Sequence, residues 1–184
     1  MHNLFFLTIF VSLLLLSCGH TDEIKENLMR MQSSHISLPL NKMRCMYREN
    51  DTLVTEDWRE KTYRVVIYSD SADCSSCVLD KLWIWNDKMK ELKQLNSNLR
   101  FIFILSPRPD RLEDVYLSLA FSGLQSHVYV DTAFVFQKDN PQIPAEYDYH
   151  TFLLNTNDSI VIVGNPIDNK SVDKLYKKLL NKNE

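Results

Sequence analysis

Two cysteines, Cys74 and Cys77, are separated by two serines and are the residues of this sequence best suited to carry out chemistry. Thiols at this spacing can form a reversible disulfide, a permanent disulfide or half of a metal site. A single pair does not supply the four ligands of a structural zinc site. Val78 stands where a c-type haem attachment motif has His. The residues around the pair must therefore decide what it does.

The pair lies between a predicted strand and a predicted helix. Residues 63–68 form a β-branched and aromatic run without helical period, which predicts a buried strand. From Val78 to Leu95, apolar residues recur at intervals of three and four, which predicts one buried face of a helix. This places Cys74 at or just before the start of the helix and Cys77 in its first turn.

That position has opposing electrostatic consequences. The free N–H groups at a helix N-terminus stabilise a thiolate and so lower the pKa of Cys74. Cys77, one turn further along, can attack a mixed disulfide formed on Cys74. Asp70 and Asp73 act in the other direction, because negative charge disfavours a thiolate. The alternative is a permanent disulfide, although closing so short a loop removes little chain entropy.

The rest of the chain predicts a mixed sheet with helices on both faces. Further strands are expected at 99–105, 127–130, 149–154 and 159–163, and the last two form a hairpin. Helices are expected from the capping box Asp110–Glu113 to about Gly123 and over 172–179, with a short helix or coil at 133–138 and an N-terminal strand or hairpin within 42–54. From residue 63 the order is β-α-β-α-β-(α)-β-β-α, and this alternation predicts parallel pairing with right-handed crossovers.

Composition indicates one globular domain. The 184 residues are 45% hydrophobic and 24% charged. The formal charge of −3 argues against a basic nucleic-acid surface. With only 3 glycines, the chain contains no Gly-rich phosphate loop.

The amino-terminal residues carry a different signal. The apolar run from Leu4 to Leu16 is shorter than the roughly 20 residues of a spanning helix and fits a secretory signal. It leads into Ser17-Cys18-Gly19, which resembles the lipobox of bacterial lipoproteins, where the signal is cut before a cysteine that is then lipidated. Two features depart from that pattern: no Lys or Arg precedes the run, and Leu16 is larger than usual. The alternative is an ordinary signal peptide.

These residues set the expected organisation and location. We expect a signal peptide at 1–17, a lipid anchor at Cys18 with a tether at 18–37, and a domain at 38–184. A cleaved signal places the protein in the cell envelope, facing the periplasm or the cell surface, where disulfides persist. Its membrane contact would be the lipid, not a spanning helix.

The order of elements around the dithiol resembles the thioredoxin superfamily, and within it the secreted or anchored TlpA-like branch, over about residues 38–182. The resemblance implies thiol–disulfide exchange with Cys74 as the nucleophile and Cys77 as the resolving cysteine. It implies protein thiols or disulfides of the envelope as partners, and no cofactor.

The sequence departs from the family pattern in three respects: the residues in and before the Cys-x-x-Cys motif, the position of the buried acid, and the cis-proline position. Asp73 replaces the usual aromatic residue, and Ser75-Ser76 lacks the usual proline. Tyr68 stands where many thioredoxins have a buried acid. His150 occupies the usual cis-proline position, where a cis bond would cost ~3 kcal/mol, so we expect a trans bond or a reshaped loop.

His150 would then lie near Cys74 and Cys77. It can fill the space left by proline, carry a proton for the thiols, or join both thiolates in a Cu or Zn site. The functions compatible with the sequence are therefore an exchange enzyme, a metal-binding protein and a redox-silent interaction module. Cys45 is expected to be a small buried hydrophobe in a strand.

Overall fold

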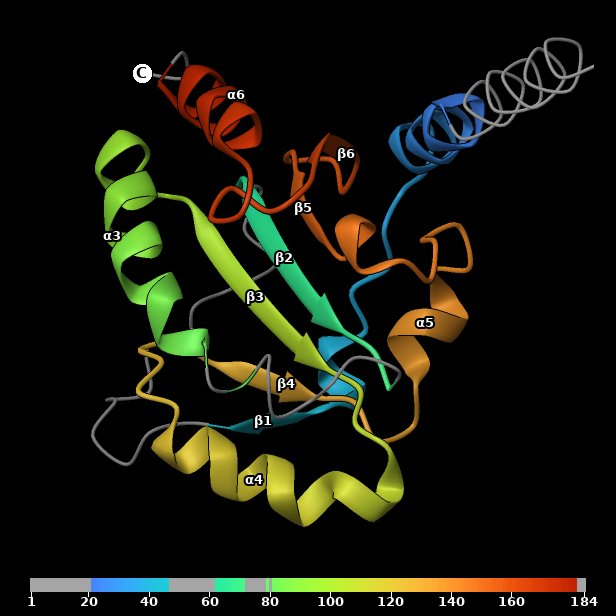
Figure 1. The fold of residues 1–184 in the computed structure, drawn as a ribbon, viewed down its shortest axis with the longest axis vertical. Helices are drawn as coiled ribbons and strands as arrows, with labels where there is room; N and C mark the ends of the chain where they lie inside the picture. Colours follow the sequence, from blue (N-terminus) through green and yellow to red (C-terminus); the bar gives the residue numbers. More distant parts are fainter. Residues whose placement is uncertain (1–20, 47–61, 72–78, 80, 182–184) are drawn as a thin grey trace, which may run out of the picture.

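The structure is a computed structural model that describes residues 21–46, 62–71, 79 and 81–181. Its centre is a six-stranded mixed sheet with the order β1-β4-β3-β2-β5-β6 (Figure 1). The strands are β1 Arg44–Met46, β2 Arg64–Ser69, β3 Arg100–Leu105, β4 Val128–Val130, β5 Thr151–Leu154 and β6 Ile160–Val163. The pairs β2–β3 and β3–β4 are parallel, and the other pairs are antiparallel.

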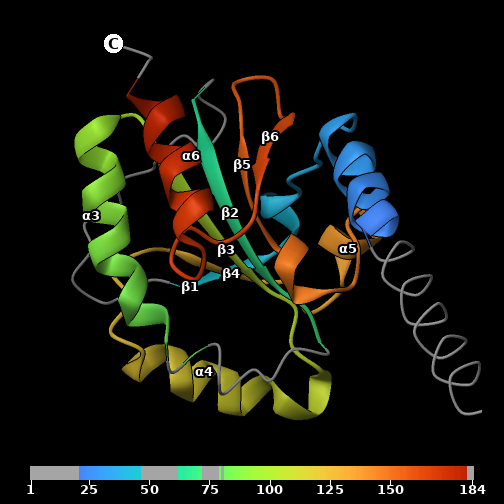
Figure 2. The same ribbon diagram turned by 45° about the horizontal axis from the view of Figure 1, so that its top comes forward.

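Helices cover both faces of this sheet. The α-helices are α3 Trp85–Leu95, α4 Leu112–Phe121, α5 Val135–Asp139 and α6 Lys170–Leu180. The 3₁₀ segments are η1 Leu40–Lys42, η2 Leu82–Ile84, η3 Pro109–Arg111 and η4 Tyr147–Tyr149. Residues 21–32 are helical too, and we call them the N-terminal helix. Figure 2 shows α3 and α6 on one side of the sheet and the N-terminal helix with α5 on the other.

Two hydrophobic clusters follow from the two faces of the strands. Successive side chains of a strand point to opposite faces. On β2, Val65 and Ile67 therefore join the cluster under α3, α4 and α6, whereas Val66 and Tyr68 join the cluster under the N-terminal helix and α5. All six residues of β2 are buried, because the strand is covered on both faces and paired on both edges.

The predicted mixed sheet with helices on both faces is confirmed, as are the late hairpin and the N-terminal strand β1. Any hairpin partner of β1 lies outside the described residues. The predicted capping box at Asp110 is wrong, because this carboxylate accepts hydrogen bonds from Arg108 Nε (3.1 Å) and Nη2 (3.0 Å). No side chain caps α4, which begins at Leu112 directly after η3.

The single helix expected from Val78 to Leu95 is interrupted. Leu79 is helical, but a turn at Lys81 and the segment η2 come before α3 begins at Trp85. The interruption does not change which side faces the core, because residues three apart share a face in both kinds of helix. Leu82 and Trp85 are 1% and 5% exposed.

The tether expected through residue 37 is part of the folded body from Met31 onward. Met31 is completely buried and Ile36 nearly so, and both belong to the cluster under the N-terminal helix. The apolar contacts of these two residues hold the segment against the sheet. Within the described residues, no helix is both long and apolar enough to span a bilayer.

Four charged side chains join α3 to α6. Lys88 Nζ lies 2.6 Å from Glu91 Oε2 and 2.9 Å from Asp173 Oδ1. Lys177 pairs with the same two carboxylates, at 2.8 Å from Asp173 Oδ2. Hydrogen bonds from Lys177 and then Lys88 hold the pKa of Glu91 below its usual value. Burial raises the pKa of Asp173, but hydrogen bonds from the same lysines outweigh it and the net pKa is lowered.

This cluster predicts a specific loss of stability in acid. A carboxyl group with a lowered folded-state pKa stabilises the fold above its unfolded pKa of about 4, and that contribution disappears as the pH falls through the folded value. We expect Glu91→Gln/Asp173→Asn to be less stable than wild type at pH 7, with a gap that closes toward pH 2. Urea unfolding at both pH values measures this, with Glu113→Gln on α4 as the control. An equal gap at both pH values would contradict the prediction.

Candidate active site

The carboxyl ends of β2 and β3 form one edge of the sheet, where several polar residues are buried. Ser106, just after β3, donates its N–H to O of Ser69, the last residue of β2, at 2.8 Å, which extends the pairing one residue beyond the end of β3. Asp70 follows β2 and is 8% exposed. The chain then passes through residues 72–78 before Leu79. Cys74 and Cys77 lie in that segment, which is outside the described residues. Cys18, near the amino terminus, is outside the described residues too.

His150 lies beside this edge, between η4 and β5. Its carbonyl oxygen accepts a hydrogen bond from Tyr68 N–H on β2 at 2.9 Å, so its backbone continues the β2–β5 pairing. No cis peptide bond occurs among the described residues, so His150 follows a trans bond, as expected from the cost of the cis form. Its side chain is buried, with 1% exposure.

The imidazole of His150 is held in one orientation. Its Nε2 lies 3.1 Å from Pro144 O, and because a carbonyl oxygen only accepts, Nε2 donates. Nδ1 is therefore the basic nitrogen of the neutral ring. The ring packs against Tyr68 at 5.0 Å between centroids and against Tyr147 at 6.5 Å.

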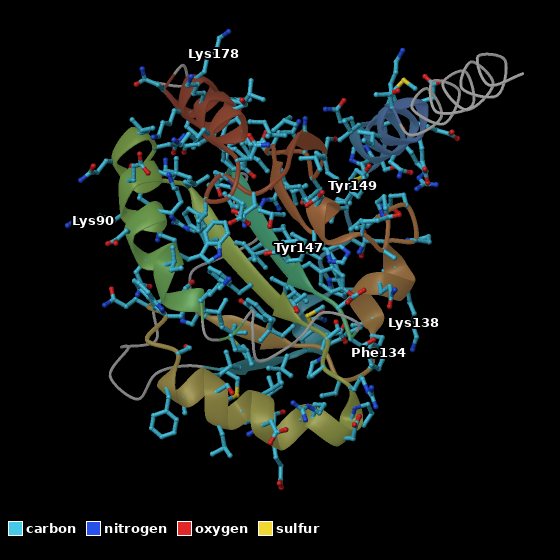
Figure 3. The ribbon with its side chains drawn as sticks, viewed as in Figure 1. Lys90, Phe134, Lys138, Tyr147, Tyr149 and Lys178 are labelled. Atoms are coloured by element: carbon cyan, nitrogen blue, oxygen red, sulfur yellow. The ribbon has the colours of Figure 1, made fainter. Side chains whose placement is uncertain are left out.

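Tyr147 was not identified from the sequence. It is 47% exposed, yet its ring contacts the buried histidine. The only sequence signal was its place in Tyr147-Asp148-Tyr149-His150, directly before the hairpin. Figure 3 shows Tyr147 and Tyr149 on this segment, with Tyr147 toward β2 and Tyr149 toward the N-terminal helix.

A cavity of about 300 Å³ opens beside this group, and we call it the inner cavity. It lies between the carboxyl end of β2, the beginning of α3, Tyr147 and the loop from β6 to α6. Ile67, Leu82 and Ile167 supply apolar wall, and Thr151 and Asn165 supply polar groups. The inner cavity can therefore accommodate an apolar side chain of a bound peptide, while the backbone of that peptide makes polar contacts.

Two other sequence predictions concern metals and Cys45. No three metal-binding side chains gather in the part of the chain that the structure describes. The proposed Cu or Zn site needs Cys74 and Cys77, so it stays outside the described residues. Cys45 lies in β1 opposite Tyr129, as a strand residue, but it is only partly buried.

Similarity to known proteins is found at the level of structure. No protein-family model matches the sequence, and no curated protein matches it. A candidate thiol:disulfide interchange protein, DsbE, from Chlorobium tepidum is 12% identical with a TM-score of 0.50, covering 75% of this chain and 93% of its own.

Two further structures are similar. The thioredoxin domain of a thiol-disulfide oxidoreductase from Bacteroides vulgatus is 11% identical with a TM-score of 0.46, covering 78% of this chain and 98% of its own. Peroxiredoxin Q from Xanthomonas campestris is 13% identical with a TM-score of 0.49, covering 80% of this chain and 96% of its own. Together with the strand order and the late hairpin, the likeness to the Chlorobium tepidum protein shows that this chain has a thioredoxin-like fold.

Proposed function

We propose that this protein is a thiol–disulfide oxidoreductase of the cell envelope, with Cys74 as its nucleophile and Cys77 as its resolving cysteine. The observation that carries the proposal is the place of the dithiol segment in the chain. That segment joins the carboxyl end of a central parallel strand to a helical residue, Leu79, in a thioredoxin-like sheet. The buried His150 and the inner cavity lie at the same edge.

The reaction is a two-electron exchange. The Cys74 thiolate attacks one sulfur of a substrate disulfide, which forms a mixed disulfide and releases one substrate thiolate. The Cys77 thiolate then attacks the sulfur of Cys74, which releases the second substrate thiolate and leaves a Cys74–Cys77 disulfide. The substrate gains two electrons and the protein loses two. The reverse sequence oxidises a substrate dithiol.

We assign His150 the role of proton carrier in this exchange. Cys77 must lose a proton before it attacks, and the departing substrate thiolate must gain one. An imidazole nitrogen can accept the first proton and supply the second. One feature supports this role: the ring of His150 is held in place by Pro144 O and by two tyrosines.

A lipid at Cys18 would hold the protein at the membrane on the extracytoplasmic side. Residues 21–32 are helical and follow this cysteine closely in the sequence, and Met31 is buried in the core. Few residues would therefore separate the lipid from the folded body, and the folded body would stay close to the bilayer surface. Protein thiols or disulfides of the envelope are the proposed substrates.

The nucleophile assignment predicts two different outcomes for the two cysteines. Cys74→Ser should reduce insulin-disulfide reduction to the uncatalysed rate, because no nucleophile remains. Cys77→Ser should accumulate a mixed disulfide with the substrate, visible as a non-reducing gel band. Cys45→Ser is the matched control and should keep full activity. Turnover by Cys74→Ser would disprove the assignment.

The role of His150 predicts a slower reaction in its glutamine variant. His150→Gln keeps an N–H donor for Pro144 O but cannot accept a proton and return it. We expect kcat to fall by about 10²-fold, the lower end for general acid–base catalysis. Thermal unfolding checks that the variant is folded. A folded variant with the wild-type kcat would show that His150 only fills space.

The proposed lipid anchor predicts that membrane association of the protein depends on Cys18. In the natural bacterial host, wild type should enter the detergent-soluble membrane fraction, and Cys18→Ser should leave it. Mass spectrometry of the amino-terminal peptide should show the acyl groups on wild type only. Equal partitioning of both proteins would rule out lipidation at this position.

A further inference from the structure

The orientation of the His150 ring depends on the loop that precedes β5. Residues 140–150 connect α5 to β5, and Pro144 in this loop supplies the carbonyl oxygen that accepts the hydrogen bond from His150 Nε2. Pro144 is buried, as the ring is. A buried N–H that loses its acceptor is costly, because it has already given up its hydrogen bond to water. Whatever holds Pro144 in place therefore also holds the ring.

Asn140 fixes the beginning of this loop. Its side chain is 1% exposed. Oδ1 accepts a hydrogen bond from Ser37 N–H at 2.8 Å, and Nδ2 donates to Ser37 O at 3.0 Å and to Phe136 O at 2.7 Å. Both amide protons and the oxygen of the side chain are thus satisfied by backbone groups. The side chain joins the end of α5 to the segment that follows the N-terminal helix.

The backbone of Asn140 connects this attachment to Pro144. Asn140 O accepts a hydrogen bond from Ile143 N–H at 3.2 Å, which closes a turn directly before Pro144. Ile143 packs against the cluster under the N-terminal helix and α5. Pro144 is the next residue, and its ring fixes its own φ. A shift of the turn would consequently move Pro144 O.

Ser37, on the other side of this attachment, is held by its neighbours. Ile36 and Leu38 are 4% and 9% exposed and belong to the same cluster as Ile143. Ile36 N–H also donates to O of Asp158, in the turn between β5 and β6, at 2.9 Å. The backbone N–H and C=O of Ser37 therefore meet Asn140 from a fixed position.

We propose that Asn140 is a positioning residue for His150. It holds the turn before Pro144 against Ser37, and so keeps in place the carbonyl oxygen that makes Nε2 the protonated nitrogen of the neutral ring. The effect on turnover rests on the proposed function, in which His150 carries a proton. The orientation of the ring is a property of the folded chain and does not depend on that function.

Nitrogen-15 NMR of the histidine ring tests the proposal without an enzyme assay. The two ring nitrogens resonate differently according to which of them carries the proton, and His150→Gln identifies the signals of this residue. In wild type we expect a single tautomer with the proton on Nε2. In Asn140→Ala the Pro144 carbonyl is released, and we expect this single tautomer to be lost. A folded Asn140→Ala variant with wild-type His150 signals would overturn the proposal.

Two further variants separate positioning from loss of stability. Asn169→Ala removes two side-chain hydrogen bonds to backbone N–H groups at the start of α6, so it should lower stability in urea but keep the His150 signals. Asn140→Ser keeps a hydroxyl oxygen but loses both Nδ2 donors, and should lose the single tautomer in part. It decides the matter if Asn140→Ala does not fold. Wild-type signals in Asn140→Ser, or equal changes in Asn169→Ala, would then overturn the proposal.

A double-mutant cycle tests whether Asn140 acts through His150. Asn140→Ala should lower kcat for insulin reduction roughly tenfold with little change in KM, which is less than the loss in His150→Gln because the imidazole is still present. In the His150→Gln background the same substitution should lower kcat no further, since no ring is left to orient. A second tenfold loss there would overturn the positioning role. Absence of turnover in wild type, with the tautomer lost in Asn140→Ala, would disprove the enzyme and support the positioning of His150.

Discussion

Complete burial of β2 is the constraint on which the rest of the structure depends. The strand pairs in parallel with β3 and antiparallel with β5, and helices cover both of its faces. Its backbone groups must be satisfied inside the protein, because an unpaired buried N–H or C=O is costly. Arg64 at its beginning is 4% exposed and is compensated by Asp158 and by Asn155 O of the hairpin turn. The hairpin is therefore tied to β2 by charge as well as by pairing.

That arrangement also determines the surroundings of His150. The same ladder that pairs β2 with β5 extends to His150 O, so the histidine is positioned by the backbone of the central strand. Its ring is then oriented by Pro144 O and by Tyr68, a residue of β2 itself. A change in the register of β2 would move both Tyr68 and the backbone partner of His150. The backbone and the ring of His150 are thus held in place by contacts with the central sheet.

Charge is distributed unevenly over the molecule, although its net value is only −3. Between α3 and α6, carboxylates and lysines alternate at close range, so that cluster is neutral and stabilises helix packing. Glu23 of the N-terminal helix and Glu146 and Asp148 of the segment before β5 line a cavity of about 430 Å³ that has no lysine or arginine among its described lining residues. The first arrangement stabilises the fold, whereas the second gathers carboxylates without neutralising lysines or arginines. Composition alone does not distinguish them.

The sequence by itself determined the strands, the late hairpin and the place of the Cys-x-x-Cys pair between β2 and a helical residue, because alternating and three-to-four-residue periodicities are local properties of a chain. It predicted His150 beside the hairpin, with a trans bond or a reshaped loop, since the cost of a cis bond before a non-proline residue is also local. Only the tertiary structure decided that a turn at Lys81 and the segment η2 interrupt the helix expected from Val78. It also decided that Met31 joins the core and that Glu23 and Glu146 line one cavity. Such pairings join residues far apart in the chain, and no local pattern records which of them pack together.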